Sequence, residues 1–126
     1  MYSTKYVKPN STPEALEAIK SLSEGKFLAG GMTLIPTLKQ RLASPDGLVD
    51  ISGCNLDSIA DEGETIKIGA MSRHVSVAES PVVKKAIPAL ASLAEGIGDR
   101  QVRNRGTLGG SVANNDPSAC YPSAVL

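Results

Sequence analysis

The N-terminal part of the chain alternates short apolar runs with segments of helical spacing. Tyr6 and Val7 predict a short strand. The sequence Ser11-Thr12-Pro13-Glu14 predicts the start of a helix, because it supplies an N-cap, a proline in the first turn and an early acidic side chain. Gly25 is the expected C-cap of this helix. Its apolar stripe, spaced by three residues, consists of Leu16, Ile19 and Leu22.

The next apolar run, Phe27-Leu28-Ala29, predicts a buried strand that leads directly into a pair of glycines. A second helix should follow, with Thr33 as its cap and Pro36 tolerated in its first turn. Its apolar face, which would point at the sheet, consists of Leu34, Ile35, Leu38 and Leu42. Ser44-Pro45-Asp46-Gly47 has the composition of a turn, and the apolar residues 48–51 predict a third strand. This order of elements predicts a small parallel βαβαβ unit.

The pattern changes after Gly53. Ile59-Ala60 and the alternating residues 65–68, separated by the polar residues 61–64, predict an antiparallel hairpin. Further helices are expected to begin after Ser72 and at three prolines, Pro81, Pro88 and Pro122. The helix from Pro88 would end near residues 96–98 and bury Ile87, Leu90, Ala91 and Ala94.

These elements predict an α+β fold of mixed α/β type with two subdomains. Residues 1–53 would form the parallel βαβαβ subdomain, and residues 54–126 would begin an α+β subdomain with an antiparallel sheet. The apolar helix expected from Tyr121 to Leu126 stops abruptly at the last residue. We therefore expect the second subdomain to be incomplete and the chain to be truncated.

Composition narrows the range of functions. The 126 residues carry 13 basic and 13 acidic side chains, so no broad positive field would attract nucleic acid or anionic lipid. Apolar runs are too short to cross a bilayer, and the N-terminus lacks the apolar core of a signal peptide, which predicts a cytoplasmic protein without membrane insertion. Cys54 and Cys120 lack metal-ligand spacing and are expected to be reduced thiols.

Two glycine pairs carry the most specific local chemistry. Residues 29–33, Ala-Gly-Gly-Met-Thr, follow a predicted strand, and residues 107–111, Thr-Leu-Gly-Gly-Ser, follow a stretch dotted with arginines. Because glycine has no Cβ atom, it lets the backbone approach a ligand closely and adopt positive φ, so that successive N–H groups can point at one anion. Each pair is a candidate half of a diphosphate cradle, although either pair alone is also a common turn.

Other motifs carry less information. Residues 96–101 begin like a dinucleotide fingerprint, but Gln101 replaces the third glycine and a helix precedes them. Asp99 reads as a turn residue, and His74, the single histidine, is expected at the surface near the start of a helix. Catalytic triads, paired carboxylates and metal-ligand clusters have no counterpart in the sequence, so no catalytic or metal-binding residue is assigned.

A longer series of motifs resembles a known family. It comprises residues 29–36, residues 41–45 with Leu48-Val49-Asp50, residues 68–71, and residues 105–111 through Asn115-Asp116-Pro117. From about Tyr6 to Leu126 the chain resembles the FAD-binding medium subunits of molybdenum hydroxylases. The nearest likeness is the medium subunit of aerobic carbon monoxide dehydrogenase, and the flavin domain of xanthine dehydrogenase is related. Members of this family continue well beyond this length, which agrees with a truncated chain.

The resemblance implies that FAD lies stretched between two subdomains. The cofactor-binding residues carried over by position are Ala29, Gly30, Gly31, Met32, Thr33, Thr107, Leu108, Gly109, Gly110 and Ser111, with Asp116 near the ribityl side. Backbone hydrogen bonds to a charged group are each worth about 1.5–3 kcal/mol, so a few of them would anchor a diphosphate without a lysine. The resemblance also implies a hetero-oligomer in which a molybdenum-cofactor large subunit and an iron–sulfur small subunit deliver electrons to this FAD, and an external acceptor removes them.

The chain departs from the family pattern at two positions. Met32 stands where carbon monoxide dehydrogenases often have histidine, and Cys120 stands where many relatives have a second aspartate facing FAD. A thiol cannot replace a carboxylate as an acceptor, so either the cofactor affinity or flavin potential differs, or Asp116 or a water substitutes. Two other functions stay open: a non-catalytic module that binds nucleotides or phosphate, and a structural interaction module whose glycine pairs only serve packing.

Overall fold

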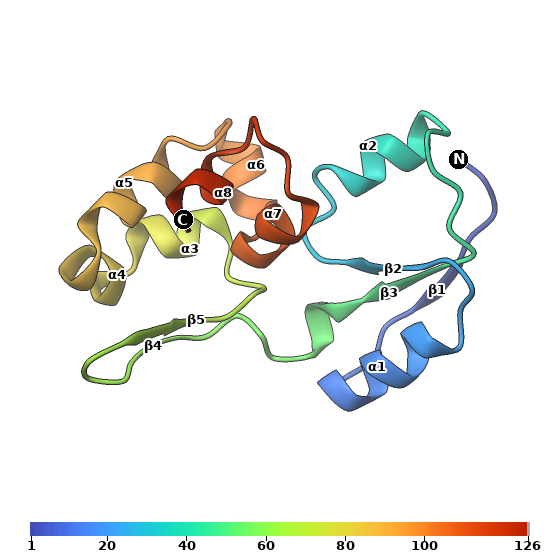
Figure 1. Cartoon of the computed structure of the whole chain (residues 1–126), viewed down its shortest axis with the longest axis horizontal. Coiled ribbons are helices and arrows are strands. Elements are labelled where there is room, and N and C mark those ends of the chain that lie inside the picture. Colours follow the sequence, from blue (N-terminus) through green and yellow to red (C-terminus); the bar gives the residue numbers. More distant parts are fainter. Residues whose placement is uncertain (126) are drawn as a thin grey trace.

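The structure, a computed structural model, describes residues 1–125 and all of their side chains except that of Ser123. Its N-terminal part is a three-stranded parallel sheet in the order β1-β3-β2, built from β1 (Lys5–Val7), β2 (Gly25–Leu28) and β3 (Gly47–Asp50). The helices α1 (Thr12–Lys20) and α2 (Leu34–Lys39) lie on opposite sides of this sheet (Figure 1). The predicted parallel βαβαβ unit is confirmed.

Helix α1 begins where the sequence predicts. The Ser11 hydroxyl oxygen accepts a hydrogen bond from the Glu14 N–H at 3.4 Å, and Pro13 occupies the first turn. The small core beneath the helix consists of Ala15, Val49 and Cys54, with Ile19 and Leu22 packed against them. Leu16, the first member of the predicted stripe, is 47% exposed and lies at the edge of this core.

Three predictions for this part are wrong. Helix α1 is capped by Ser21, and Gly25 instead opens β2, where the Leu22 side chain packs over it. Phe27 is 46% exposed, because it lies on an edge strand. Leu42 is 73% exposed, because α2 ends at Lys39 and the chain turns away from the sheet before this residue.

The C-terminal part begins with a short 3₁₀ turn (Ile51–Gly53) and the antiparallel hairpin of β4 (Ile59–Asp61) and β5 (Ile66–Ile68). Short helices follow along the rest of the described chain: α3 (His74–Glu79), α4 (Pro81–Ala86), α5 (Pro88–Glu95), α6 (Arg100–Arg105), α7 (Leu108–Asn114) and α8 (Cys120–Ala124). In Figure 1 they form one group beside the hairpin, and the loop after β2 reaches this group.

This helical group has its own core, which consists of Val77, Ala78, Val83, Ala91, Ala94 and Tyr121. The hairpin covers it with Ile59, Ile66 and Ile68. The predicted starts of α4 and α5 at prolines are confirmed. Ile87, however, is 44% exposed, because it is the N-cap of α5 rather than part of its inner face. Ser72 does not cap α3: its buried hydroxyl donates to the Asp57 carbonyl oxygen at 3.2 Å.

Two helices, α6 and α7, were not expected from the sequence pattern. Asp99 is the N-cap of α6, and its carboxylate accepts a hydrogen bond from the Val102 N–H at 2.8 Å. Helix α7 begins after Thr107, so Gly109 and Gly110 lie in its first turn rather than in a turn between elements. Glycine in a helix interior is about 1 kcal/mol less favourable than alanine, and the glycine pair therefore hides the helical signal.

The last predicted helix also begins earlier than expected, at Cys120 instead of Pro122, and Leu126 lies outside the described residues. The predicted α+β class, with a small parallel sheet followed by a small antiparallel sheet, is confirmed. The subdomain boundary between residues 53 and 54 stays a prediction. Within residues 1–125, every helix is too short or too polar to cross a membrane.

Candidate functional site

The first glycine segment, residues 29–33, connects β2 to α2. Gly31 has a φ of +76°, a left-handed conformation that glycine adopts at little cost and other residues rarely adopt. Its carbonyl oxygen accepts a hydrogen bond from the Ile35 N–H at 3.0 Å, so helical hydrogen bonding starts at this residue. Gly31 therefore turns the chain from strand into helix.

The N–H groups of this segment are available donors. Of the acceptors in residues 1–125, none receives a hydrogen bond from the amides of Gly30, Gly31, Met32 or Thr33. Met32 and Thr33 are exposed, and the Thr33 hydroxyl caps no amide although Thr33 is the N-cap of α2. Unpaired amides at the start of a helix attract anions. The first segment is therefore suited to hold a phosphate group.

The second glycine segment, residues 107–111, uses its amides differently. The N–H groups of Leu108, Gly109, Gly110 and Ser111 donate, in that order, to Ser72 O, Ala70 O, Thr107 Oγ1 and Thr107 O at 2.9, 2.9, 3.1 and 3.0 Å. These four donors are used inside the protein, so the structure does not offer the amide cradle expected here. Contacts from this segment to a ligand would have to come from its glycine Cα surface or its side chains.

The structure brings the two segments together. A Cβ atom on Gly30 would overlap the Arg105 carbonyl oxygen and lie 2.9 Å from the Gly106 Cα atom. A Cβ atom on Gly110 would lie 3.4 Å from the Ala29 Cβ atom. Figure 1 shows the loop after β2 beside α7. Segments 72 residues or more apart in sequence thus meet at one place, which we call the glycine junction: residues 29–33 together with residues 105–111.

Close packing explains part of the glycine content of the junction. A Cβ atom on Gly109 would lie 2.6 Å from the Ala70 Cβ atom and 2.7 Å from the Ala70 carbonyl oxygen. A Cβ atom on Gly110 would lie 2.7 Å from the Thr107 hydroxyl oxygen, which caps α7. Gly30 and Gly109 therefore allow close contact with neighbouring backbone, and Gly110 leaves room for the capping Thr107 hydroxyl, whereas Gly31 serves the conformation of the loop.

Asp116 and Cys120 lie beyond the end of α7. Asn115 ends the helix in a left-handed conformation with φ of 49°, and the exposed Asp116 follows it. One carboxylate oxygen of Asp116 accepts a hydrogen bond from the Ser118 N–H at 2.9 Å. Cys120 is exposed and is the first residue of α8. The role of Asp116 in cofactor binding stays a prediction.

The expectation for His74 is wrong, because this side chain is only 5% exposed. Its ring lies against the ring of the fully buried Tyr121, with 5.2 Å between the centroids and 43° between the planes. Burial lowers the pKa of His74 and raises the pKa of Tyr121 to about 12, with a small contribution from Cys120 to the latter. Both side chains are therefore neutral near pH 7.

Two polar atoms of this pair have no hydrogen-bond partner within the described residues: His74 Nδ1 and the Tyr121 hydroxyl oxygen. An unsatisfied buried polar group costs about 1–3 kcal/mol, which calls for an explanation beyond packing. A sequence signal for the burial of His74 exists, because Val77 and Ala78 follow at helical spacing and are also buried.

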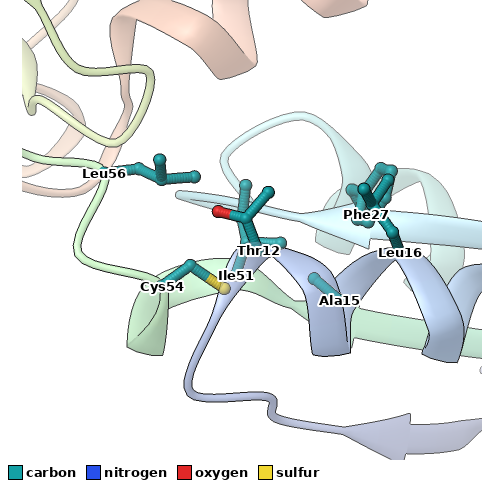
Figure 2. Close-up of a pocket in the computed structure, with 7 residues that line it drawn as sticks. All are labelled: Thr12, Ala15, Leu16, Phe27, Ile51, Cys54 and Leu56. Carbon is teal, nitrogen blue, oxygen red and sulfur yellow. The ribbon is translucent and has the colours of Figure 1, made fainter.

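An apolar groove of about 230 Å³ lies between α1 and the sheet (Figure 2). It is lined by Thr12, Ala15, Leu16, Phe27, Ile51, Cys54 and Leu56. None of these side chains is charged, and none belongs to the glycine junction, so the groove does not suit a diphosphate. In the part of the chain that the structure describes, histidine, cysteine and acidic side chains form no group of three that could hold a metal ion.

Comparison with known proteins identifies the family. Residues 2–126 match the family described as FAD binding domain in molybdopterin dehydrogenase. The chain is 42% identical to the carbon monoxide dehydrogenase medium chain of Hydrogenophaga pseudoflava, an alignment that covers 97% of this chain and 43% of that protein. It is 33% identical to the nicotine 6-hydroxylase medium subunit of Paenarthrobacter nicotinovorans, over 97% of this chain and 44% of that protein.

The fold agrees with this match. A solved structure of carbon monoxide dehydrogenase from Hydrogenophaga pseudoflava, which lacks the Mo-pyranopterin moiety of the molybdenum cofactor, superposes with a TM-score of 0.95 at 42% identity. The superposition covers 98% of this chain and 44% of that chain, so the chain spans less than half the length of these relatives. Free amides at the first glycine segment fit the diphosphate of FAD. The chain belongs to the family of FAD-binding domains in molybdopterin dehydrogenases.

Proposed function

We propose that this chain is the diphosphate-binding part of an FAD-binding electron-transfer subunit in a molybdenum-containing hydroxylase or dehydrogenase. Relatives that are named as medium chains or subunits of such enzymes support the proposal. When bound, FAD supplies the electron-carrying chemistry, and the protein supplies position and electrostatics. Consequently no side chain of this chain need act as a general acid or base.

The observation that carries the proposal is the set of unpaired amides at residues 30–33, located where the two glycine segments meet. These N–H groups and the Thr33 hydroxyl would donate to the diphosphate oxygens. The second segment would provide the close glycine surface of Gly109 and Gly110 and the Ser111 hydroxyl, since its amides already donate within the protein. The Asp116 carboxylate would accept a hydrogen bond from the ribityl side.

The proposed assembly is a hetero-oligomer. In it, a large subunit with the molybdenum cofactor oxidises the substrate, iron–sulfur centres of a small subunit pass electrons to FAD, and an external acceptor reoxidises the flavin. A cytoplasmic location belongs to the same proposal. An interaction module whose glycines only serve packing is the second candidate, and the contacts of Gly30 and Gly109 with neighbouring backbone favour it in part.

The test of the proposal is Thr33→Val in the full-length protein. The substitution removes a hydroxyl that caps no amide and keeps the β-branched shape, so the fold should persist. Losing one hydrogen bond to a charged diphosphate should weaken FAD binding about 10- to 100-fold. Flavin absorbance per protein after dialysis, and titration of FAD into the flavin-free protein, measure this change.

The matched control is Thr65→Val, because Thr65 is an exposed threonine between the strands of the hairpin. Its FAD affinity should equal that of the wild type. If Thr33→Val also binds FAD with unchanged affinity, the diphosphate does not lie at the first glycine segment. A full-length wild-type protein that binds no flavin would favour the packing module instead.

A further inference from the structure

We propose that His74 is a positioning residue for the cofactor site: its neutral imidazole, packed between Tyr121 and Gly106, keeps the glycine junction closed, and protonation of the imidazole loosens it. The inference rests on the proposed placement of FAD at this junction. The His74 side chain would not bind FAD itself. It acts through the backbone of Gly106.

The contacts of His74 with Gly106 are direct. A Cβ atom on Gly106 would overlap His74 Nε2 and lie 2.8 Å from His74 Cδ2, so the imidazole packs on the bare Cα atom of this glycine. The backbone N–H of His74 also donates to the Gly106 carbonyl oxygen at 3.0 Å. Ring and backbone of His74 therefore hold the same residue from one side.

Gly106 links this contact to both glycine segments. Its Cα atom lies 2.9 Å from the position that a Cβ atom of Gly30 would occupy, so the first segment also packs against Gly106. The next residue, Thr107, pairs with Arg73 in an isolated antiparallel bridge and then caps α7. A shift of the imidazole would therefore move the surface on which Gly30 rests and the start of α7 together.

The surroundings of the imidazole do not suit a positive charge. His74 Nδ1 and the Tyr121 hydroxyl oxygen are buried with no hydrogen-bond partner among residues 1–125. The titratable or charged residues on α3, next to it and on the elements packed around it are Arg73, Glu79, Lys84, Lys85, Glu95, Arg100, Arg103, Arg105, Cys120 and Tyr121. Both carboxylates in this set, Glu79 and Glu95, are exposed and form no ion pair with His74.

The direction of the pH effect follows from this environment. Burial lowers the pKa of His74, so the unfolded or opened chain binds the proton more readily than the closed junction does. The contribution of neutral His74 is complete above the ordinary histidine pKa of about 6.5 and is lost as the pH falls from there through the lowered pKa. FAD affinity should therefore decline on the acid side only.

The test measures the FAD dissociation constant of the full-length protein from about pH 8 to about pH 5, a range that includes the ordinary pKa of histidine. The wild-type constant should rise as the pH falls, by at most about tenfold per pH unit. In His74→Gln, which keeps a neutral polar side chain but cannot titrate, the constant should stay within about twofold over the range. Tyr121→Phe keeps the titrating histidine and should keep the acid dependence.

The outcomes separate the inference from the proposed function. A wild-type protein that binds FAD with a flat pH profile overturns the inference and leaves the FAD site standing. The same holds if His74→Gln shows the acid dependence of the wild type. A wild-type protein that binds no FAD at any pH overturns the proposed function itself. If His74→Gln does not fold, the wild-type profile and the Tyr121→Phe profile still decide the matter, because both must show the acid dependence.

Discussion

The two glycine segments have similar sequences but use their backbone groups in opposite ways. Residues 29–33 contain the left-handed Gly31 and amides that meet no acceptor among the described residues, whereas the amides of residues 108–111 all donate within the protein. A glycine pair therefore indicates that something approaches the backbone closely. Whether this is a ligand or another backbone segment depends on what the fold places there. We propose that the first segment binds the ligand and that the second supports it.

The largest expected effect is the loss of contact between the segments in Gly30→Ala. Its Cβ atom would overlap the Arg105 carbonyl oxygen, and a backbone atom cannot rotate away as a side chain can. Unfolding by denaturant should show a loss of about 2–3 kcal/mol in the free energy of unfolding of the full-length protein.

Gly96→Ala is the matched control for Gly30→Ala. Gly96 has φ of −80°, and a Cβ atom there would meet its nearest neighbours at 3.6 and 3.7 Å. Its free energy of unfolding should change by less than about 0.5 kcal/mol. Equal stability of the two variants would show that the segments do not pack as described.

A second expected difference lies in amide hydrogen exchange. Amides of Met32 and Thr33 should exchange at least about a hundredfold faster than those of Leu108 and Gly109 when FAD has been removed, since only the latter are hydrogen-bonded. Binding of FAD should slow exchange in the first segment and leave the second nearly unchanged. Exchange followed by mass spectrometry on short peptides measures both. If FAD slowed amide exchange in the second segment alone, the second segment and not the first would be the one that binds the diphosphate.

The smallest expected effect concerns the two threonines. Thr107→Val removes the cap of α7 and should lower the free energy of unfolding by about 1 kcal/mol. Thr33→Val removes a hydroxyl that caps nothing and should change it by less than about 0.5 kcal/mol in the absence of FAD. Denaturant titration of the flavin-free protein compares them. A larger effect at Thr33 would mean that its hydroxyl supports the fold rather than the ligand.

Much of the local structure was predictable from the sequence, because local chemistry determines it. The Ser11 cap and Pro13 start α1, and Pro81 and Pro88 start α4 and α5. Alternation of apolar residues predicted the hairpin, and the order of elements predicted the parallel sheet. The glycine segments were also identified in advance, since few other patterns let the backbone approach so closely.

What the sequence by itself determined, then, was the order of the elements up to α5, the class of the fold and the two places of close backbone approach. Only the tertiary structure decided which amides remain unpaired, because the acceptors Ala70 and Ser72 come from a distant part of the chain. It also decided which residues bury His74, since Tyr121 and Gly106 contact it from other elements. Local propensity cannot contain this information, because contacts between distant residues exist only after the chain has folded.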